Sequence, residues 1–289
     1  MRPALPIANA GGSLRFLYHN PIGRVILKVL TRPFVSKIVG KYMDSSLSKG
    51  RIKKFIRQNN IDLSCYQIED WNSFNSFFHR HIKPEARPLG NADAGELISP
   101  ADAKVLAYPI QNGLVLPIKE SEYTVASLLR NDELAKKYEN GWAVVFRLCV
   151  DDYHRYGYPA SGAKEADVFL PGVLHTVQPI ALRMRPVFCE NSRSYTLLHT
   201  EQFGDVVQME VGALCVGKIV NHDPDQVKTV TAGEEKGYFA FGGSTIVLLF
   251  SENQYEPDPE LIENSRNDLE TVVRFGECVG KCVHTHQTA

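Results

Sequence analysis

The sequence predicts an α+β protein, with basic helices at the N-terminus followed by a β-rich body that forms a sandwich or a barrel. Three observations support this prediction. The first 60 residues combine helical apolar spacing with an excess of positive charge, and from about residue 96 short apolar runs alternate with clusters of Gly, Pro, Asn and Asp. The composition of the 289 residues, 44% hydrophobic and 22% charged, is that of a globular chain.

The helices of the N-terminal region, residues 1–90, are predicted from prolines, glycines and apolar spacing. Pro21 and Pro33 suit the first turn of a helix, and Gly40 and Gly50 suit helix ends. Between residues 22 and 39, apolar residues recur at helical spacing and are interrupted by four basic residues. A short helix is expected within residues 71–78, and the prolines of residues 83–88 end it and begin a linker.

Charge is divided unevenly along the chain. Residues 1–60 hold 12 basic residues and one acidic residue, a net charge of +11, whereas the remainder holds 20 basic and 32 acidic residues, a net charge of −12. A basic amphipathic segment of this kind favours an anionic membrane surface as its partner. The alternative is a helical cap that packs on the core and leaves a solvated basic face. No motif that reads nucleic acid accompanies the charge, so no nucleic acid is expected.

The body, residues 91–289, is predicted to contain short strands and one helix near residues 125–138. The run at residues 246–250 is rich in β-branched and large apolar side chains, as buried strands are. The expected strands cover residues 104–108, 114–118, 143–150, 206–211, 214–220 and 246–250.

Hydropathy and cysteine usage narrow the class of protein further. No stretch of 18 uncharged apolar residues occurs, so no transmembrane helix is predicted. The chain has no secretory signal peptide, and we therefore expect a reducing compartment and free thiols for its six cysteines. The tail from Cys278 to His286 only loosely follows metal-ligand spacing, and we expect a strand and a frayed end rather than a metal site.

A candidate reactive serine lies where a flexible segment meets a strand. Gly242 and Gly243 precede Ser244, so the carbonyl of Gly243 can bend toward the neighbouring hydroxyl, a geometry that suits self-cleavage between Gly243 and Ser244. An ordinary tight turn is the alternative. Asp102 and His154 could complete a relay, in which the carboxylate orients the imidazole and the imidazole removes the hydroxyl proton. The alternatives are an Asx turn for Asp102 and a loop histidine for His154.

Further motifs surround these residues in a fixed order. They are Phe74-Asn75-Ser76-Phe77-Phe78, Lys83-Pro84, Arg87-Pro88, Ser99-Pro100-Ala101-Asp102, Asp152-Tyr153-His154-Arg155, residues 174–179, Asn191-Ser192-Arg193, residues 211–217, residues 233–239 and Gly243-Ser244-Thr245. With these motifs the chain resembles the phosphatidylserine decarboxylase family along nearly its whole length.

The resemblance implies a carboxy-lyase of phospholipid biosynthesis that makes its own cofactor. Ser244 would attack the carbonyl of Gly243, and elimination would split the chain into residues 1–243, the beta chain, and residues 244–289, the alpha chain. Ser244 would become a covalent pyruvoyl group that binds the amine of phosphatidylserine as a Schiff base. Loss of CO2 would then give phosphatidylethanolamine. An enzyme of this kind without a transmembrane helix must reach its lipid from the bilayer surface, and the basic first 60 residues fit that need, so we expect a peripheral protein on the cytoplasmic face of the cell membrane. A homodimer is left open.

One position departs from the family pattern. Many members read D-Y-H-x-x-H, but the position of the second histidine is Gly157 here, and glycine cannot act as a base. His154 is therefore assigned both to proton removal from Ser244 and to proton donation after decarboxylation. His175 is the reserve candidate, because it stands where the family more often has an aromatic residue. Two alternatives stay open, a decarboxylase of a soluble amino acid and a non-catalytic membrane-binding relative.

Overall fold

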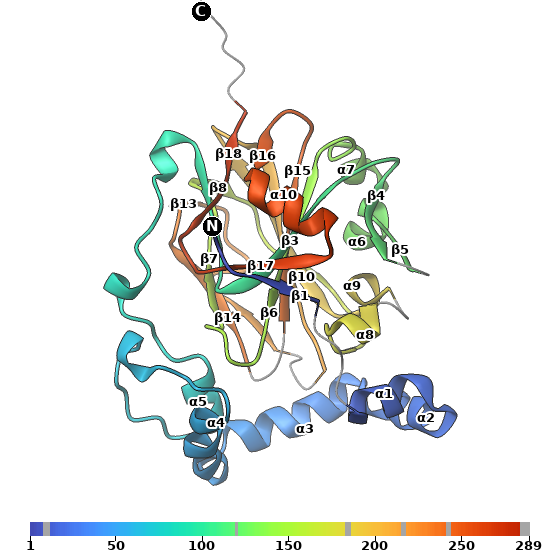
Figure 1. Ribbon diagram of the computed structural model, residues 1–289, viewed down its shortest axis with the longest axis vertical. Coiled ribbons are helices and arrows are strands. Elements are labelled where there is room, and N and C mark those ends of the chain that lie inside the picture. Colours follow the sequence, from blue (N-terminus) through green and yellow to red (C-terminus); the bar gives the residue numbers. More distant parts are fainter. Residues whose placement is uncertain (8–11, 119–120, 183–185, 215–217, 241–243, 284–289) are drawn as a thin grey trace, which may run out of the picture.

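The computed structural model describes residues 1–7, 12–118, 121–182, 186–214, 218–240 and 244–283. The fold is α+β, as predicted. Figure 1 shows stacked open sheets forming the body, with the first helices lying along one end of it. Gly243, His284 and His286, which the sequence singled out, lie outside the described residues.

The N-terminal helices follow the predicted proline positions. Pro21 and Pro33 each begin a helix, but Gly40 lies inside a helix rather than at its end. The helix at residues 74–78 begins with a capping box between Ser73 and Ser76. The segments are α1 (Gly12–His19), α2 (Pro21–Leu30), α3 (Pro33–Asp44), η1 (Ser46–Arg51), α4 (Ile52–Gln58), η2 (Leu63–Cys65), α5 (Phe74–Phe78), η3 (Pro84–Ala86) and η4 (Ala92–Ala94).

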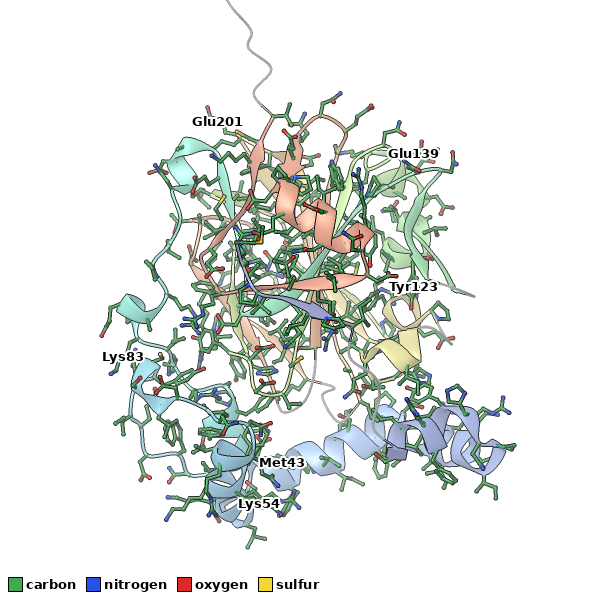
Figure 2. All side chains as sticks on the ribbon, in the orientation of Figure 1. Met43, Lys54, Lys83, Tyr123, Glu139 and Glu201 are labelled. Carbon is green, nitrogen blue, oxygen red and sulfur yellow. The ribbon has the colours of Figure 1, made fainter. Side chains whose placement is uncertain are left out.

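Helices α3, α4 and α5 enclose a small apolar cluster of their own. Phe77 and Phe78 of α5 are fully buried in it, together with Met43, which lies where α3 meets α4 and α5 (Figure 2). The neighbouring Lys54 of α4 is exposed to solvent. This cluster anchors α5 beside the body, and the segment after α5 leads directly to the candidate site.

The principal sheet is antiparallel throughout and includes the N-terminal strand β1, which the sequence did not predict. Its central strand is β15, whose seven residues are all buried between β6 and β11. The strand order is β1 (Ala4–Pro6), β17 (Leu269–Val273), β3 (Ala103–Pro109), β6 (Trp142–Leu148), β15 (Ser244–Phe250), β11 (Gly204–Val211), β10 (Arg193–Thr200), β8 (Gly162–Lys164) and β13 (Lys228–Val230), and β9 (Val168–Leu170) also pairs with β10.

The principal sheet has a separate apolar core on each face, because alternate side chains of a strand point to opposite sides. Val247 belongs to the core that α1 and the helices after β5 cover, and Ile246 belongs to the core beneath a second, three-stranded sheet. The remaining helices are α6 (Val125–Leu129), α7 (Asp132–Lys136), α8 (Pro179–Leu182), α9 (Val187–Glu190) and α10 (Pro259–Arg266). One three-stranded sheet has the order β12 (Ile219–Asn221), β14 (Glu235–Phe239), β7 (Arg155–Gly157), and the other has the order β16 (Tyr255–Pro257), β18 (Cys278–Cys282), β2 (Glu96–Ile98). Strands β4 (Leu114–Ile118) and β5 (Ser121–Thr124) form a two-stranded sheet.

Two predicted elements differ from the observed ones. The helix expected near residues 125–138 is two helices, because Arg130 adopts a left-handed conformation and the side chain of Asn131 caps the second helix. The strand expected at residues 214–220 is wrong in extent, since β12 begins only at Ile219 and Leu214 lies in a turn. The other five predicted strands coincide with β3, β4, β6, β11 and β15 to within a few residues.

Candidate active site

The candidate site lies at one end of the principal sheet, where three neighbouring strands begin or end together. Ser244 opens β15 and pairs with Leu148, the last residue of β6. Asp102 directly precedes Ala103, the first residue of β3, which is the other neighbour of β6. The antiparallel register therefore brings residues more than 140 positions apart to the same end of the sheet.

Ser244 is fully buried at the junction of two sheets. Its side chain shares a face with Leu148 and Ile246, which is the face that β12, β14 and β7 cover. Its Oγ has no hydrogen-bond partner within the part of the chain that the structure describes. A buried hydroxyl without a partner costs free energy, so this position is a candidate for a reactive group.

His154 is held beside the segment that leads to Ser244. The backbone amide of Phe239, the last residue of β14, donates to the carbonyl of His154 at 2.9 Å, and Ser244 follows five residues later. The Nδ1 of His154 lies 2.9 Å from the carbonyl oxygen of Asp152. Because a carbonyl only accepts, Nδ1 carries a proton, so Nε2 is the ring nitrogen that would act as a base. The imidazole is fully buried and packs against the ring of Phe78, at 4.0 Å between centroids.

Asp102 is engaged by an arginine that the sequence reasoning did not assign to the site. Arg87 donates to both carboxylate oxygens, at 2.8 Å and 2.5 Å, and the amide of Phe275 donates to Oδ1 at 2.8 Å. Burial lowers the pKa of Arg87, but the hydrogen bonds and charge of Asp102 outweigh it and raise that pKa above its ordinary value. In the structure, Asp102 is therefore ion-paired with Arg87, whereas the Nδ1 of His154 is hydrogen-bonded to the backbone carbonyl of Asp152.

Arg87 could have been found from the sequence only by its position. It stands in the Lys-Pro-x-x-Arg-Pro segment, 15 residues before Asp102, in a stretch that reads as a linker. A linker arginine gives no local sign of its partner. The ion pair is nearly buried, with about a tenth of each side chain exposed, and removing one member of such a pair costs about 3–5 kcal/mol.

A second group of charges borders the site on the same end of the sheet. The Lys104 ammonium lies 3.0 Å from the sulfur of Cys149 and 3.7 Å from the carboxylate of Asp152, and Arg147 Nη1 lies 3.1 Å from the same sulfur. Burial raises the pKa of Asp152 to about 6, although the charge of Lys104 opposes this. Cys149 lies within the strand expected at residues 143–150, but in the structure it follows β6 and is half-buried. The available signals for this group were Lys104 at the start of one predicted strand and Arg147 inside another.

His175, the reserve base, connects the N-terminal helices to the body. Its Nδ1 lies 3.1 Å from the hydroxyl of Tyr18 in α1, and its Nε2 lies 3.5 Å from the carboxylate of Glu190. The side chain of Asn191 binds both the amide and the carbonyl of His175. These contacts give the ring a docking role, so His154 is the better candidate for proton transfer.

Gly157 lies within β7, where the backbone leaves no room for a side chain. A Cβ atom at this position would lie 2.8 Å from the carbonyl oxygen of Glu234 and 2.9 Å from the ring of Phe275. The glycine is therefore built into the packing of β7 on its neighbours. A histidine could not be inserted at this position without moving backbone.

Comparisons with known proteins find similar sequences over most of this chain. The model of the phosphatidylserine decarboxylase family matches residues 74–281. The phosphatidylserine decarboxylase proenzyme 2 of Clostridium acetobutylicum is 43% identical over 272 residues, which cover 93% of this chain and 92% of that protein. The phosphatidylserine decarboxylase proenzyme of Clostridium botulinum strain Kyoto is also 43% identical, with 92% of each covered, and that of Fusobacterium nucleatum is 41% identical, with 93% of this chain and 91% of that protein covered. The chain belongs to the phosphatidylserine decarboxylase family.

Proposed function

We propose that this chain is a self-processing phosphatidylserine decarboxylase that releases CO2 from phosphatidylserine and leaves phosphatidylethanolamine. The observation that supports it most directly is the position of Ser244, fully buried at the start of β15, with His154 hydrogen-bonded to the strand that precedes it. The names of the relatives support the same substrate.

The proposed first reaction is cleavage between Gly243 and Ser244. The Oγ of Ser244 attacks the carbonyl carbon of Gly243 while Nε2 of His154 takes the hydroxyl proton, and the peptide bond is replaced by an ester. Elimination across the Cα–Cβ bond of Ser244 then releases the carboxylate of Gly243, separates residues 1–243 from residues 244–289, and leaves residue 244 as a dehydroalanine. Its enamine tautomerises to an imine, and water hydrolyses that imine to the ketone of the pyruvoyl group with release of ammonia. The carbonyl of Asp152 keeps the proton of His154 on Nδ1, so we assign this transfer to Nε2.

The surroundings of Ser244 fit a pyruvoyl group formed from that residue. Residue 244 is enclosed by strands on both sides, and its Oγ forms no hydrogen bond with the described residues that such a change would break. When bound, the group supplies a ketone that accepts electrons from the breaking bond to the carboxylate. His154 is the residue that we propose donates the proton after CO2 leaves, and Phe78 limits the access of water to the ring.

The first helices supply a surface for docking on an anionic bilayer. Ile22, Val25 and Val29 of α2 are 68%, 64% and 60% exposed, and Phe34 at the start of α3 is 70% exposed. Tyr18 and Leu27 pack these helices on the core, and the exposed apolar face opposite them favours docking on a membrane over a purely structural cap. The basic residues between them add about 1 kcal/mol each near an anionic surface. Among the described helices, none combines the length and apolar character needed to cross a bilayer.

This exposed face also favours phosphatidylserine over a soluble amino acid. A lipid substrate stays in the bilayer, so its enzyme gains from a peripheral position on the membrane, which we place at the cytoplasmic face. We further propose that the two chains remain together after cleavage, and the homodimer stays a prediction.

Intact mass spectrometry of the purified protein tests the proposal. We expect masses for residues 1–243 and for residues 244–289 carrying a pyruvoyl N-terminus, together with conversion of phosphatidylserine in vesicles. Ser244→Ala is the control and should remain one inactive chain. A wild-type chain that stays whole after long incubation would support the non-catalytic alternative, and a cleaved protein that acts only on free amino acids would support the soluble-substrate alternative.

A further inference from the structure

Arg80 is a fully buried cation whose donors are largely unused. It follows α5 by two residues, and its side chain has no exposed surface. Its guanidinium lies over the rings of Tyr66 and Phe77, at 4.0 Å and 4.7 Å from their centroids. Nη1 makes one long hydrogen bond, 3.4 Å, to the carbonyl of Phe77, whereas Nε and Nη2 have no partner among the residues that the structure describes.

Other buried cations of this protein are compensated. Arg147 has both carboxylate oxygens of Glu270, and Lys236 has the carboxylate of Glu210 at 2.6 Å. Arg193, which lacks a carboxylate in these contacts, donates to four backbone carbonyls. Burial of a charge without a counter-ion is costly, and the two aromatic faces offset part of that cost without engaging the in-plane N–H donors of Nε and Nη2. Arg80 therefore has the properties of a receptor for an anion.

Arg80 lies next to the residues that enclose His154. Phe78, two positions earlier, packs on the imidazole, and Arg155, the residue after His154, donates to the carbonyl of His79 at 2.7 Å. On the other side, the ring of Tyr66 lies 6.2 Å from that of Tyr153. The segment that carries Arg80 is thus fixed to the segment that carries the proposed acid and base.

We propose that Arg80 binds the phosphodiester of the lipid headgroup and so sets the preference for phosphatidylserine over free serine. This proposal rests on the proposed function. An arginine offers a planar pair of donors that matches two phosphate oxygens. Both Arg80 and Ser244 are fully buried in the uncleaved chain, so the proposal requires that the headgroup gains access to Arg80 after cleavage.

The chemistry favours the phosphodiester over the substrate carboxylate. Decarboxylation turns the carboxylate into neutral CO2, so a cation bound to that group would stabilise the ground state more than the transition state and would slow the reaction. The phosphodiester keeps its charge throughout. A cation bound to it lowers KM and leaves kcat almost unchanged.

Variants of the full chain test the proposal. Arg80→Gln removes the charge, Arg80→Lys keeps the charge but loses the paired donors, and Arg57→Gln removes an exposed cation from α4 as the matched control. Self-cleavage is measured first by mass, because Ser244 and His154 remain and the cleavage should proceed. We then expect Arg80→Gln to raise KM for soluble dihexanoyl phosphatidylserine on the order of tenfold, with kcat within about twofold. The KM of Arg80→Lys should lie between those of the wild type and Arg80→Gln, and the KM of Arg57→Gln should equal that of the wild type.

The outcomes separate the two proposals. A wild-type chain that does not cleave contradicts the proposed function, whereas a cleaved Arg80→Gln enzyme with unchanged KM overturns the role of Arg80. A large fall in kcat at unchanged KM would also overturn it. If the variants do not fold, competition experiments on the processed wild-type enzyme still test the role of Arg80. Glycerophosphoserine and inorganic phosphate should compete with the lipid, glycerophosphoserine more strongly, and free serine should not. Absence of competition by both phosphates would overturn the proposal.

Discussion

Asp152 links the protonation of the candidate site to the stability of the fold. Burial raises the pKa of its carboxyl to about 6, from a value of 3.8 in the unfolded chain. The folded state therefore binds this proton more tightly than the unfolded state. The resulting contribution to stability is complete below pH about 4 and is lost as the pH rises to about 6.

We predict that Asp152→Asn becomes more stable relative to its parent as the pH rises from 4 to 7. The difference in unfolding free energy between variant and parent should change by at most about 3 kcal/mol over this range, the amount that corresponds to the shift of the Asp152 pKa from 3.8 to about 6. Thermal unfolding across this pH range, in a Ser244→Ala background that keeps the chain whole, measures it. Asp151→Asn alters an exposed neighbour and is the control. A difference that does not vary with pH would contradict the prediction.

Gly157 explains at the residue scale why this chain lacks a second histidine in its Asp-Tyr-His segment. We predict that Gly157→Ala destabilises the protein by about 1–3 kcal/mol, because its methyl group would press on the carbonyl of Glu234 and the ring of Phe275. Urea unfolding in the same background measures this. Gly40→Ala is the matched control, since a methyl group there meets no atom within 4 Å and should stabilise α3 by about 0.5–1 kcal/mol. Equal stability of Gly157→Ala and its parent would refute this explanation.

At the scale of elements, α2 presents its apolar side chains outward because its buried side is occupied by α1. Gly23 and Leu27 are the buried residues of α2, and a side chain at Gly23 would collide with the backbone of Phe16 in α1. The two helices therefore pack closely through a glycine. This contact leaves the stripe of Ile22, Val25 and Val29 in solvent, which is unusual unless another surface covers it.

We predict that replacing Ile22, Val25 and Val29 together by serine weakens binding to anionic vesicles by at least about tenfold, because each apolar side chain contributes on the order of 1 kcal/mol when it enters the interface. Co-sedimentation with vesicles that contain phosphatidylserine measures the binding. The control replaces Val168, Phe169 and Val227, which are exposed on the body, by serine. If both triple variants bind equally, α2 is not the docking surface. Unchanged melting temperatures would show that the loss is not due to unfolding.

At the scale of the whole molecule, local features could be predicted from the sequence, and long-range ones could not. Pro21 and Pro33 set helix starts through their fixed φ, and the apolar run after Ser244 set the central strand, since both signals lie within a few residues. The pairing of Arg87 with Asp102 and of β1 with β17 joins segments whose own sequences carry no sign of the partner. The predicted relay of Asp102, His154 and Ser244 thus stays a prediction, with Arg87 and the carbonyl of Asp152 added to its surroundings.

The segment after the proposed cleavage point, residues 244–289, pairs with strands of the preceding segment at three places in the body. Its first strand, β15, lies between β6 and β11, its strand β17 lies between β1 and β3, and β18 pairs with β2. Seven consecutive buried residues in β15 alone represent a large apolar area. Breaking the peptide bond that precedes the first residue of β15 removes none of these strand pairings.

We therefore predict that residues 1–243 and 244–289 stay associated after cleavage and separate only when the protein unfolds. Native mass spectrometry should give a complex with one copy of each chain, or two copies of each if the protein is a homodimer, whereas a denaturing gel should show two bands. Ser244→Ala should give the same native assembly and a single band on the gel. Free short chain under native conditions would contradict the prediction, because it would mean that β15 leaves the centre of the sheet once its N-terminal connection is cut.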